Sequence, residues 1–301
     1  MRSTKKMLIL GCVLIALGVG LFAGVIGLNG WKIEGLDGEV FNVNKYDINE
    51  SFDSVVINTD TADITVLPSE NGNCTVECKD LTKITHTVIV ENGTLKISVV
   101  DERKWYEKLI SFASPSIKVY LPDAEYKDLK IDEATGDVDI RGGVAFRDIN
   151  IDLSTGDVKM GTVWAQNVSI DVTTGDVWLK ELLCDNKLSI KLTTGDMELS
   201  NVKCVEIESD GSTGEVEMKD VIAYGNMYLK RTTGDIVLKK CDADTLSIQS
   251  TTGSVTGTLL SEKLFDADAT TGDVHVPSTK NGGVCKIRTT TGSIWFGYVK
   301  Q

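Results

Sequence analysis

The 301-residue sequence predicts an all-β fold: a parallel β-solenoid (β-helix) of about 19–20-residue coils, preceded by an irregular β region and by one transmembrane helix. Three observations support this prediction. A Thr-Gly pair recurs nine times at an almost constant interval, apolar residues two apart flank each of these glycines, and a 22-residue stretch near the N-terminus carries no charge. Repeats of this length indicate a solenoid, a propeller or an array, and apolar residues at every second position indicate strands.

The N-terminal stretch predicts a membrane anchor. Residues 7–28 would form a helix of about 33 Å, enough to cross a hydrocarbon core of about 30 Å. Arg2, Lys5 and Lys6 precede this stretch, which predicts that residues 1–6 lie in the cytoplasm and that the chain after the helix lies outside the cell. Residues 29–50 are expected to be a linker between the helix and the β domain. A cleaved signal peptide is the alternative, although the stretch is long for one and no A-x-A-like site follows it. A lipoprotein signal ending at Cys12 would have too short an apolar core.

Residues 51–130 are predicted to form irregular coils that cap the solenoid. Thr61-Ala62-Asp63 lies between two short apolar runs and matches the repeat, with Ala62 in the place of Gly. Two alternating runs within 87–99 flank Asn92-Gly93, which indicates a hairpin. Residues 117–122 read as a strand ended by Pro122, and 101–116 are expected to hold a short amphipathic helix over the end of the stack.

Residues 131–301 are predicted to form the regular solenoid. The apolar positions change from odd to even offsets across each glycine, so the chain turns there, where Gly tolerates a positive φ. One strand–turn–strand unit cannot bury its own apolar face, whereas stacked units share one core. A further apolar position follows seven residues after the Gly in six units, at Val163, Leu182, Val202, Val221, Cys241 and Leu260. The structural turn glycines are Gly136, Gly156, Gly175, Gly195, Gly214, Gly234, Gly253, Gly272 and Gly292.

Repeat length varies by one residue, always between this further apolar position and the next strand, so this edge is expected to be a loop. At the C-terminal end, residues 294–299 are expected to cover the last coil or to dock a partner.

The N-terminal span, the irregular β region ending in Tyr120-Leu121-Pro122 and the repeated I-x-x-[TS]-T-G-D-V units resemble the bacterial "putative adhesin", β-strand-repeat family of unknown function, over about residues 51–301. The resemblance implies an envelope-associated protein with an N-terminal membrane anchor. Some members resemble accessory proteins of envelope-stress signalling. The resemblance carries over no catalytic residue. Ser254 and Ser293 depart from the motif at the Asp position, which suggests that Asp is not required in every coil.

Stacking would place the acids that follow the Thr-Gly pairs in one column. We expect them to accept hydrogen bonds from the N–H groups of their own turns. A weaker alternative is Ca²⁺ held between coils, since Ca²⁺ prefers carboxylate and carbonyl oxygens. A third is a polysaccharide-cleaving site of paired carboxylates, but a catalytic site occurs once, whereas these acids repeat evenly without long insertions. The Ca²⁺ candidates are Asp137, Asp157, Asp176 and Asp196.

The column of threonines before the glycines is expected to bridge coils through hydroxyl groups, with an ice-binding surface as a remote alternative. Outward positions hold Trp178, His275 and Trp295, which form a candidate binding face because aromatic side chains supply much contact energy at interfaces. Cys184 and Cys204 would be stacked neighbours, close enough for a disulfide, and the sequence leaves open whether they are bridged.

Composition restricts the function further. The chain has 31 Lys and Arg against 44 Asp and Glu, a net charge of −13, which argues against nucleic acid as a partner. Two His and no evident metal-ligand spacing leave little scope for zinc catalysis, and we expect no cofactor and no enzymatic activity. The sequence therefore predicts a membrane-anchored, extracytoplasmic, non-enzymatic binding, adhesin-like or scaffold module. Its partner would be an envelope protein, a wall polymer or a second copy of itself. Accessory function in envelope-stress signalling is the alternative, and a polysaccharide-active enzyme is a lower one.

Overall fold

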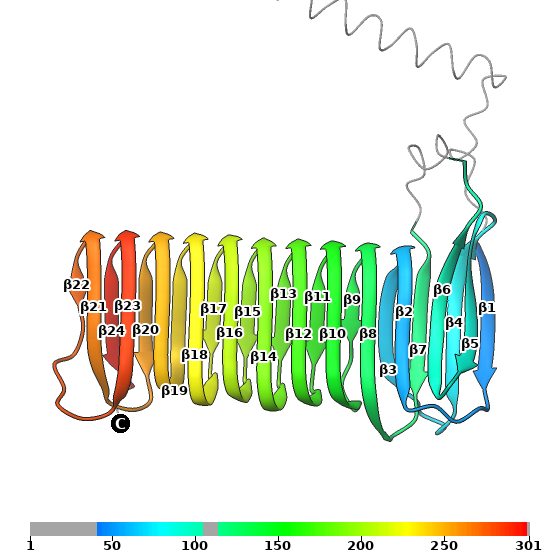
Figure 1. Cartoon of the computed structure of the whole chain (residues 1–301), viewed down its shortest axis with the longest axis horizontal. Coiled ribbons are helices and arrows are strands. Elements are labelled where there is room, and N and C mark those ends of the chain that lie inside the picture. Colours follow the sequence, from blue (N-terminus) through cyan, green and yellow to red (C-terminus); the bar gives the residue numbers. More distant parts are fainter. Residues whose placement is uncertain (1–40, 105–113, 300–301) are drawn as a thin grey trace, which may run out of the picture. The chain divides into compact units, whose positions relative to one another are not determined.

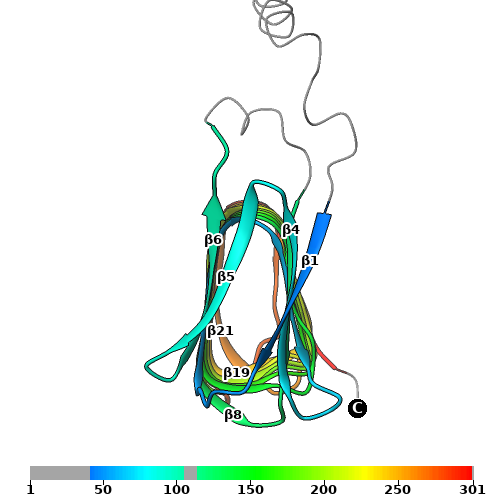
Figure 2. The ribbon, with the colours of Figure 1, turned by 90° about the vertical axis from the view of Figure 1, so that its right-hand side faces the viewer.

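A computed structural model describes residues 41–104 and 114–299, and it contains 24 strands in this part of the chain. The regular body is a parallel β-solenoid with two walls (Figures 1 and 2). One wall consists of long strands: β8 (Glu125–Thr135), β10 (Ala145–Thr155), β12 (Trp164–Thr174), β14 (Leu183–Thr194), β16 (Lys203–Thr213), β18 (Ile222–Thr233) and the later part of β19 (Ile236–Thr252). The other consists of short strands: β9 (Val138–Ile140), β11 (Val158–Gly161), β13 (Val177–Lys180), β15 (Met197–Ser200), β17 (Val216–Lys219) and the beginning of β19.

Equivalent residues of successive coils stand beside one another, as the sequence predicts. Ile151 pairs with Ile131 on one side and with Ile170 on the other, and all three are buried. This register puts the inward apolar side chains of every coil into one continuous core. The parallel β-solenoid expected from the repeat is therefore confirmed.

The corner at each Thr-Gly pair admits only glycine for two reasons. The nine repeat glycines have φ angles between 131° and 149°, a region that side chains disfavour. A Cβ atom on Gly156 would also lie 1.9 Å from the carbonyl oxygen of Gly136 on the neighbouring coil. The coils thus approach most closely along this column of glycines.

The structure corrects two expectations about the second corner. The variation in repeat length does not lie in a loop, because the long strands are continuous there and absorb the extra residue as bulges, as between Cys184 and Lys187. Leu260 is not in the core: it is 48% exposed, and Leu259 takes the buried place beside Cys241. The reason is that this coil is one residue shorter and has no counterpart of Lys240.

The N-terminal part continues the parallel ladders with β2, β3, β6 and β7, and adds β1, β4 and β5, which pair antiparallel. Thr61 pairs with Thr135, so Ala62 does occupy the glycine position, and the hairpin around Asn92-Gly93 is confirmed. β1 forms within the stretch 29–50 that was expected to be a linker, and it pairs antiparallel with β4. The helix expected within 101–116 falls largely on 105–113, outside the described residues. The strands are β1 (Phe41–Ile48), β2 (Ser54–Thr61), β3 (Asp63–Pro68), β4 (Cys74–Leu81), β5 (Ile84–Glu91), β6 (Thr94–Asp101) and β7 (Ser116–Leu121).

The C-terminal coils are not stacked in sequence order. The strands are β20 (Val255–Leu259), β21 (Lys263–Thr271), β22 (Val274–His275), β23 (Gly283–Thr291) and β24 (Ile294–Tyr298). β23 lies between β19 and β21, and β24 lies between β20 and β22. The expectation that residues 294–299 cover the last coil is therefore wrong. In Figure 1 the red final coil, β23 and β24, lies between β19 and β20 on one side and the orange β21 and β22 on the other. β21 and β22 therefore form the end of the stack.

The six described cysteines are free thiols and are buried, Cys241 and Cys285 in the core as expected. Cys184 and Cys204 do pair as neighbours, without a bond between their sulfurs. Within the described residues, no helix has the length and apolarity needed to cross a membrane. The predicted span at 7–28 lies outside these residues.

Candidate functional site

The acids that follow the Thr-Gly pairs accept hydrogen bonds that link neighbouring coils. Oδ1 of Asp137 accepts a hydrogen bond of 2.9 Å from the backbone N–H of Asp157, and Oδ1 of Asp157 accepts one of 2.9 Å from Asp176. Asp176 and Asp196 act in the same way toward the next coils, at 2.7 and 2.8 Å. The donor thus lies on the neighbouring coil rather than in the turn of the acid itself. In the described part of the chain, these carboxylates do not gather into a group of three that could share one ion.

The threonines before the glycines also act through the backbone. The N–H of Gly156 donates to the carbonyl oxygen of Thr174, and Gly175 donates in the same way to Thr194. The threonine side chains point outward and are exposed.

The outward aromatic residues separate into two places. The Trp178 ring lies under Nζ of Lys159, at 4.7 Å from the ring centroid. His275 and Trp295 come together because β22 pairs with β24, and their rings stack at 4.0 Å. Trp295 is half exposed, at 50%. Trp178 belongs to the same outward column of the short-strand wall, but the column runs through four other residues before it reaches Trp295, so the three aromatic side chains do not form one contact patch. These four residues are Glu198, Glu217, Val237 and Thr256.

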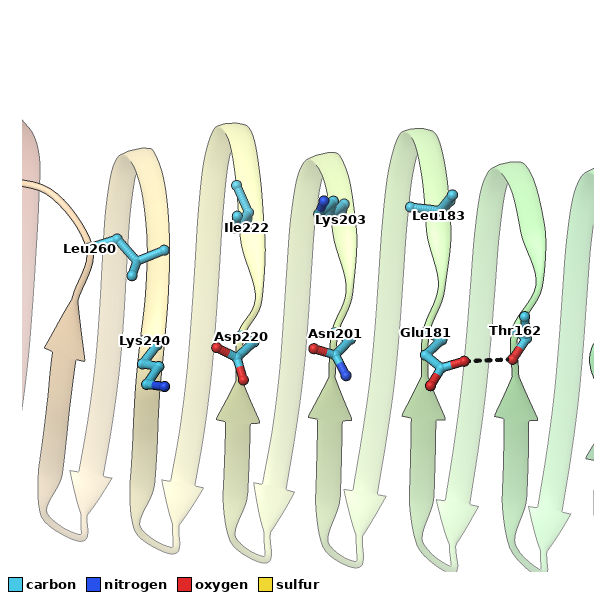
Figure 3. A pocket seen from close by; sticks show the side chains of 9 residues that line it. All are labelled: Thr162, Glu181, Leu183, Asn201, Lys203, Asp220, Ile222, Lys240 and Leu260. Carbon is cyan, nitrogen blue, oxygen red and sulfur yellow. Dashed lines mark hydrogen bonds between the residues drawn. The ribbon is translucent and has the colours of Figure 1, made fainter. Parts of the chain in front are cut away.

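A groove runs along the second corner of the solenoid, where each short strand passes into the next long one. It has a volume of about 650 Å³ and is lined by residues of six consecutive coils (Figure 3). Two rows of side chains line it. One row, which we call the apolar row, holds Leu183, Ile222 and Leu260 together with one charged residue, Lys203. The polar row holds Thr162, Glu181, Asn201, Asp220 and Lys240.

The polar row has an unusual backbone. All five of its residues have φ angles between 52° and 58°, the left-handed region that normally favours glycine. The coils satisfy the backbone around them: the N–H of Glu181 donates to Ser200, and that of Leu183 donates to Val163. A strained conformation of a non-glycine residue costs about 1–3 kcal/mol and is typical of functional positions. Glycine would relieve this strain, but none of the five positions is glycine.

The groove combines charge with apolar surface. Glu181 and Asp220 are balanced by Lys203 and Lys240, and the Thr162 hydroxyl donates to a carboxylate oxygen of Glu181 at 2.9 Å. Leu183 is 49% exposed at its edge. Our sequence reasoning missed this site. The available signal was the polar residue that stands six positions after the glycine, between two apolar positions, in five consecutive coils.

Several solved structures share a similar chain path with this chain at low sequence identity. A "putative adhesin" from Parabacteroides merdae has a TM-score of 0.50 and 14% identity, with 88% of this chain and 98% of that chain covered. Another from Bacteroides fragilis has a TM-score of 0.46, 14% identity and coverage of 86% and 98%. A "putative lipid binding protein" from Parabacteroides distasonis has a TM-score of 0.43, 17% identity and coverage of 86% and 97%.

No curated protein matches the sequence. The model of one family does match, over residues 52–208 and again over 183–300, which together span nearly all of the solenoid. The chain belongs to the Toastrack DUF4097 family.

Proposed function

We propose that this protein is a non-enzymatic binding module of the bacterial cell envelope and that the groove of the second corner holds an elongated ligand. The observation that carries the proposal is the row of five left-handed polar residues beside exposed apolar side chains. Such a row presents hydrogen-bonding groups and apolar surface to one occupant at the same time. These are the two kinds of contact that ligand sites combine.

The spacing of the coils favours an extended ligand. Neighbouring parallel strands lie about 4.8 Å apart, so five coils repeat similar contacts over about 20 Å. Each contact is weak because the groove is open, but contacts at a fixed interval add when one chain lies along them. The ladders on both sides of the corner keep the interval fixed. A wall glycan strand or an extended peptide has the required form.

Catalysis is not part of the proposal, because the repeated acids already serve as acceptors between the coils. We further propose that residues 7–28 hold the module at the outer face of the cell membrane. The support is the uncharged length of this stretch and the basic residues before it.

Binding of the full chain to purified cell-wall sacculi and to membrane-free envelope protein, measured by co-sedimentation, tests the proposal. Changing Leu183 and Leu260 together to Glu places charge on two half-exposed groove positions and should weaken binding at least tenfold. The matched control changes Val43 and Ile89, two other exposed apolar residues, to Glu and should bind like the unaltered protein. Equal binding by the groove variant and the control, or no binding by the unaltered protein, would overturn the proposal.

A further inference from the structure

Three potential metal ligands meet in the interior at the N-terminal end of the solenoid. Cys78 and Asp80 are two residues apart on β4 and point to the same side, and His86 lies on β5 after a tight turn. The Cys78 sulfur, a carboxylate oxygen of Asp80 and a ring nitrogen of His86 all lie within 4.8 Å of one another. Cys78 and Asp80 are fully buried and His86 is 3% exposed. We propose that Cys78, Asp80 and His86 bind a divalent transition-metal ion of the zinc type.

The groups around the cluster already hold these ligands in position. His86 Nδ1 lies 2.7 Å from Oδ1 of Asp80, while its Nε2 lies 3.3 Å from the hydroxyl of Thr59. The other carboxylate oxygen of Asp80 accepts a hydrogen bond of 2.7 Å from the side-chain amide of Asn44. Metal-binding histidines and carboxylates are typically fixed by such outer partners. Two ligating atoms of a tetrahedral zinc ion lie about 3.3 Å apart, so Nδ1 and Oδ1 would separate by several tenths of an ångström on binding.

The charges of the set match a divalent cation. A thiolate from Cys78 and a carboxylate from Asp80 carry two negative charges, and a neutral His86 adds none. A bound divalent ion therefore leaves the buried cluster neutral, whereas a net charge at this depth would be costly. Binding releases the thiol proton of Cys78 to the solvent. The neutral imidazole of His86 then carries its one proton on Nε2, facing the hydroxyl of Thr59, and Nδ1 is free to coordinate.

The type of ligand selects the type of metal. Thiolate and imidazole favour zinc and its neighbours in the first transition row, whereas Ca²⁺ and Mg²⁺ require a shell of oxygens. Three protein ligands leave the fourth tetrahedral position to a water molecule. Three protein ligands with one open position are the usual pattern of catalytic zinc, and Thr59, His86 and Asp80 also line up as hydroxyl, imidazole and carboxylate. All of these side chains are buried away from any substrate, so we assign the ion a structural role. Bound metal would fasten β4 and β5 to each other and, through Asn44 and Thr59, to β1 and β2.

Cobalt binding to the full chain tests the proposal. After removal of metal with a chelator, titration with Co²⁺ should give one ion per chain, with visible bands of tetrahedral cobalt and a thiolate-to-cobalt band in the near ultraviolet. Cys78→Ser should remove the thiolate band and weaken binding at least ~100-fold, and Asn44→Ala should weaken it ~10–100-fold. Cys74→Ser alters a buried thiol on the same strand that lies outside the cluster, so it should bind like the unaltered protein.

The neighbouring thiols of Cys184 and Cys204 offer a second check, because they could also attract cobalt. A thiolate band that Cys184→Ser removes and Cys78→Ser leaves would overturn the proposal. Absence of the thiolate band in the unaltered protein would do the same, and this measurement does not depend on how well any variant folds. Zinc should also raise the thermal midpoint of the unaltered protein and of Cys74→Ser, and an unchanged midpoint in both would contradict a structural role for the metal.

Discussion

Replacing Glu133 by Gln should remove most of a pH dependence of stability that this residue creates. Glu133 is 2% exposed and occupies an inward position where the next coil has Leu153. Its Oε1 accepts hydrogen bonds of 3.2 Å from the N–H groups of Ala62 and Thr135, whereas Oε2 has no hydrogen-bond partner among the described residues. Burial raises the pKa of Glu133 to about 8, against the opposing effect of these two hydrogen bonds, and the charges of Asp60 and Asp63 raise it further.

The sign follows from which state loses its proton first. Below an ordinary glutamate pKa of 4.5, the residue is protonated in the folded and in the unfolded chain, and its full contribution to stability is present. Between this value and about 8 the unfolded chain ionises while the folded chain keeps its proton, so stability falls as the pH rises. The difference between the two pKa values corresponds to about 5 kcal/mol at most, of which about 3 kcal/mol is lost by pH 7.

Gln has the shape of the protonated acid and keeps the acceptor for both N–H groups, but it does not ionise. The free energy of unfolding, from urea denaturation at several values between pH 5 and pH 8, should therefore match that of the unaltered protein near pH 5 and exceed it by about 3 kcal/mol at pH 7. Glu125→Gln, at an exposed acid on the same strand, should follow the unaltered protein at every pH. A stability difference between Glu133→Gln and the unaltered protein that stays constant over this range would refute the reasoning.

Three more predictions concern the column of glycines, the column of acids and a buried charge, all measured as urea midpoints. Gly175→Ala should destabilise by at least about 3 kcal/mol, because its Cβ would lie 1.8 Å from the carbonyl oxygen of Gly156 on the preceding coil, at a φ of 141°. Gly297→Ala, with open space around the added atom, should be nearly neutral. Asp176→Ala should cost about 1–2 kcal/mol by leaving the N–H of Asp196 without its acceptor, and Asp176→Asn should cost less because the amide oxygen can replace it. Arg231→Met should stabilise the protein by about 1–3 kcal/mol, because burial lowers the pKa of this guanidinium to about 10 and its Nε lacks a partner among the described residues. A loss of stability would show instead that the buried charge is compensated.

The frame of the solenoid could be predicted from the sequence because it depends on spacing alone. A glycine that must avoid a neighbouring carbonyl, as at Gly156, recurs wherever the coils touch, and the apolar residues around it alternate with the strand period. That Leu259, rather than the expected Leu260, occupies the core position could not be predicted in this way. Both residues are leucine, and only the register beside Cys241 decides which of them turns inward.

The two candidate sites were hidden for different reasons. The groove depends on φ angles at residues such as Asn201 and Asp220, and the residue types there vary from coil to coil, so no repeated letter marks the site. The cluster of Cys78, Asp80 and His86 joins two strands at a spacing that matches no familiar metal motif. Its outer partner Asn44 lies in a stretch that was expected to be a linker. Both sites depend on contacts between different strands, whereas the repeat specifies only the pattern of residues within one coil.

The order of the last two coils shows how side chains decide which coils pack beside each other. Gly257 pairs with Phe296, and a Cβ on Gly257 would lie 2.5 Å from the Phe296 ring, so the inserted coil fits only beside a coil that lacks a side chain there. The inserted coil buries Ile287 completely, whereas the coil displaced to the end offers Ala267, which is only half buried. The insertion thus places Ile287, rather than the smaller Ala267 with which it pairs, at this interior position. It also leaves the outermost coil joined at both of its ends to interior strands, so that fraying at this end of the stack cannot begin from a free chain end.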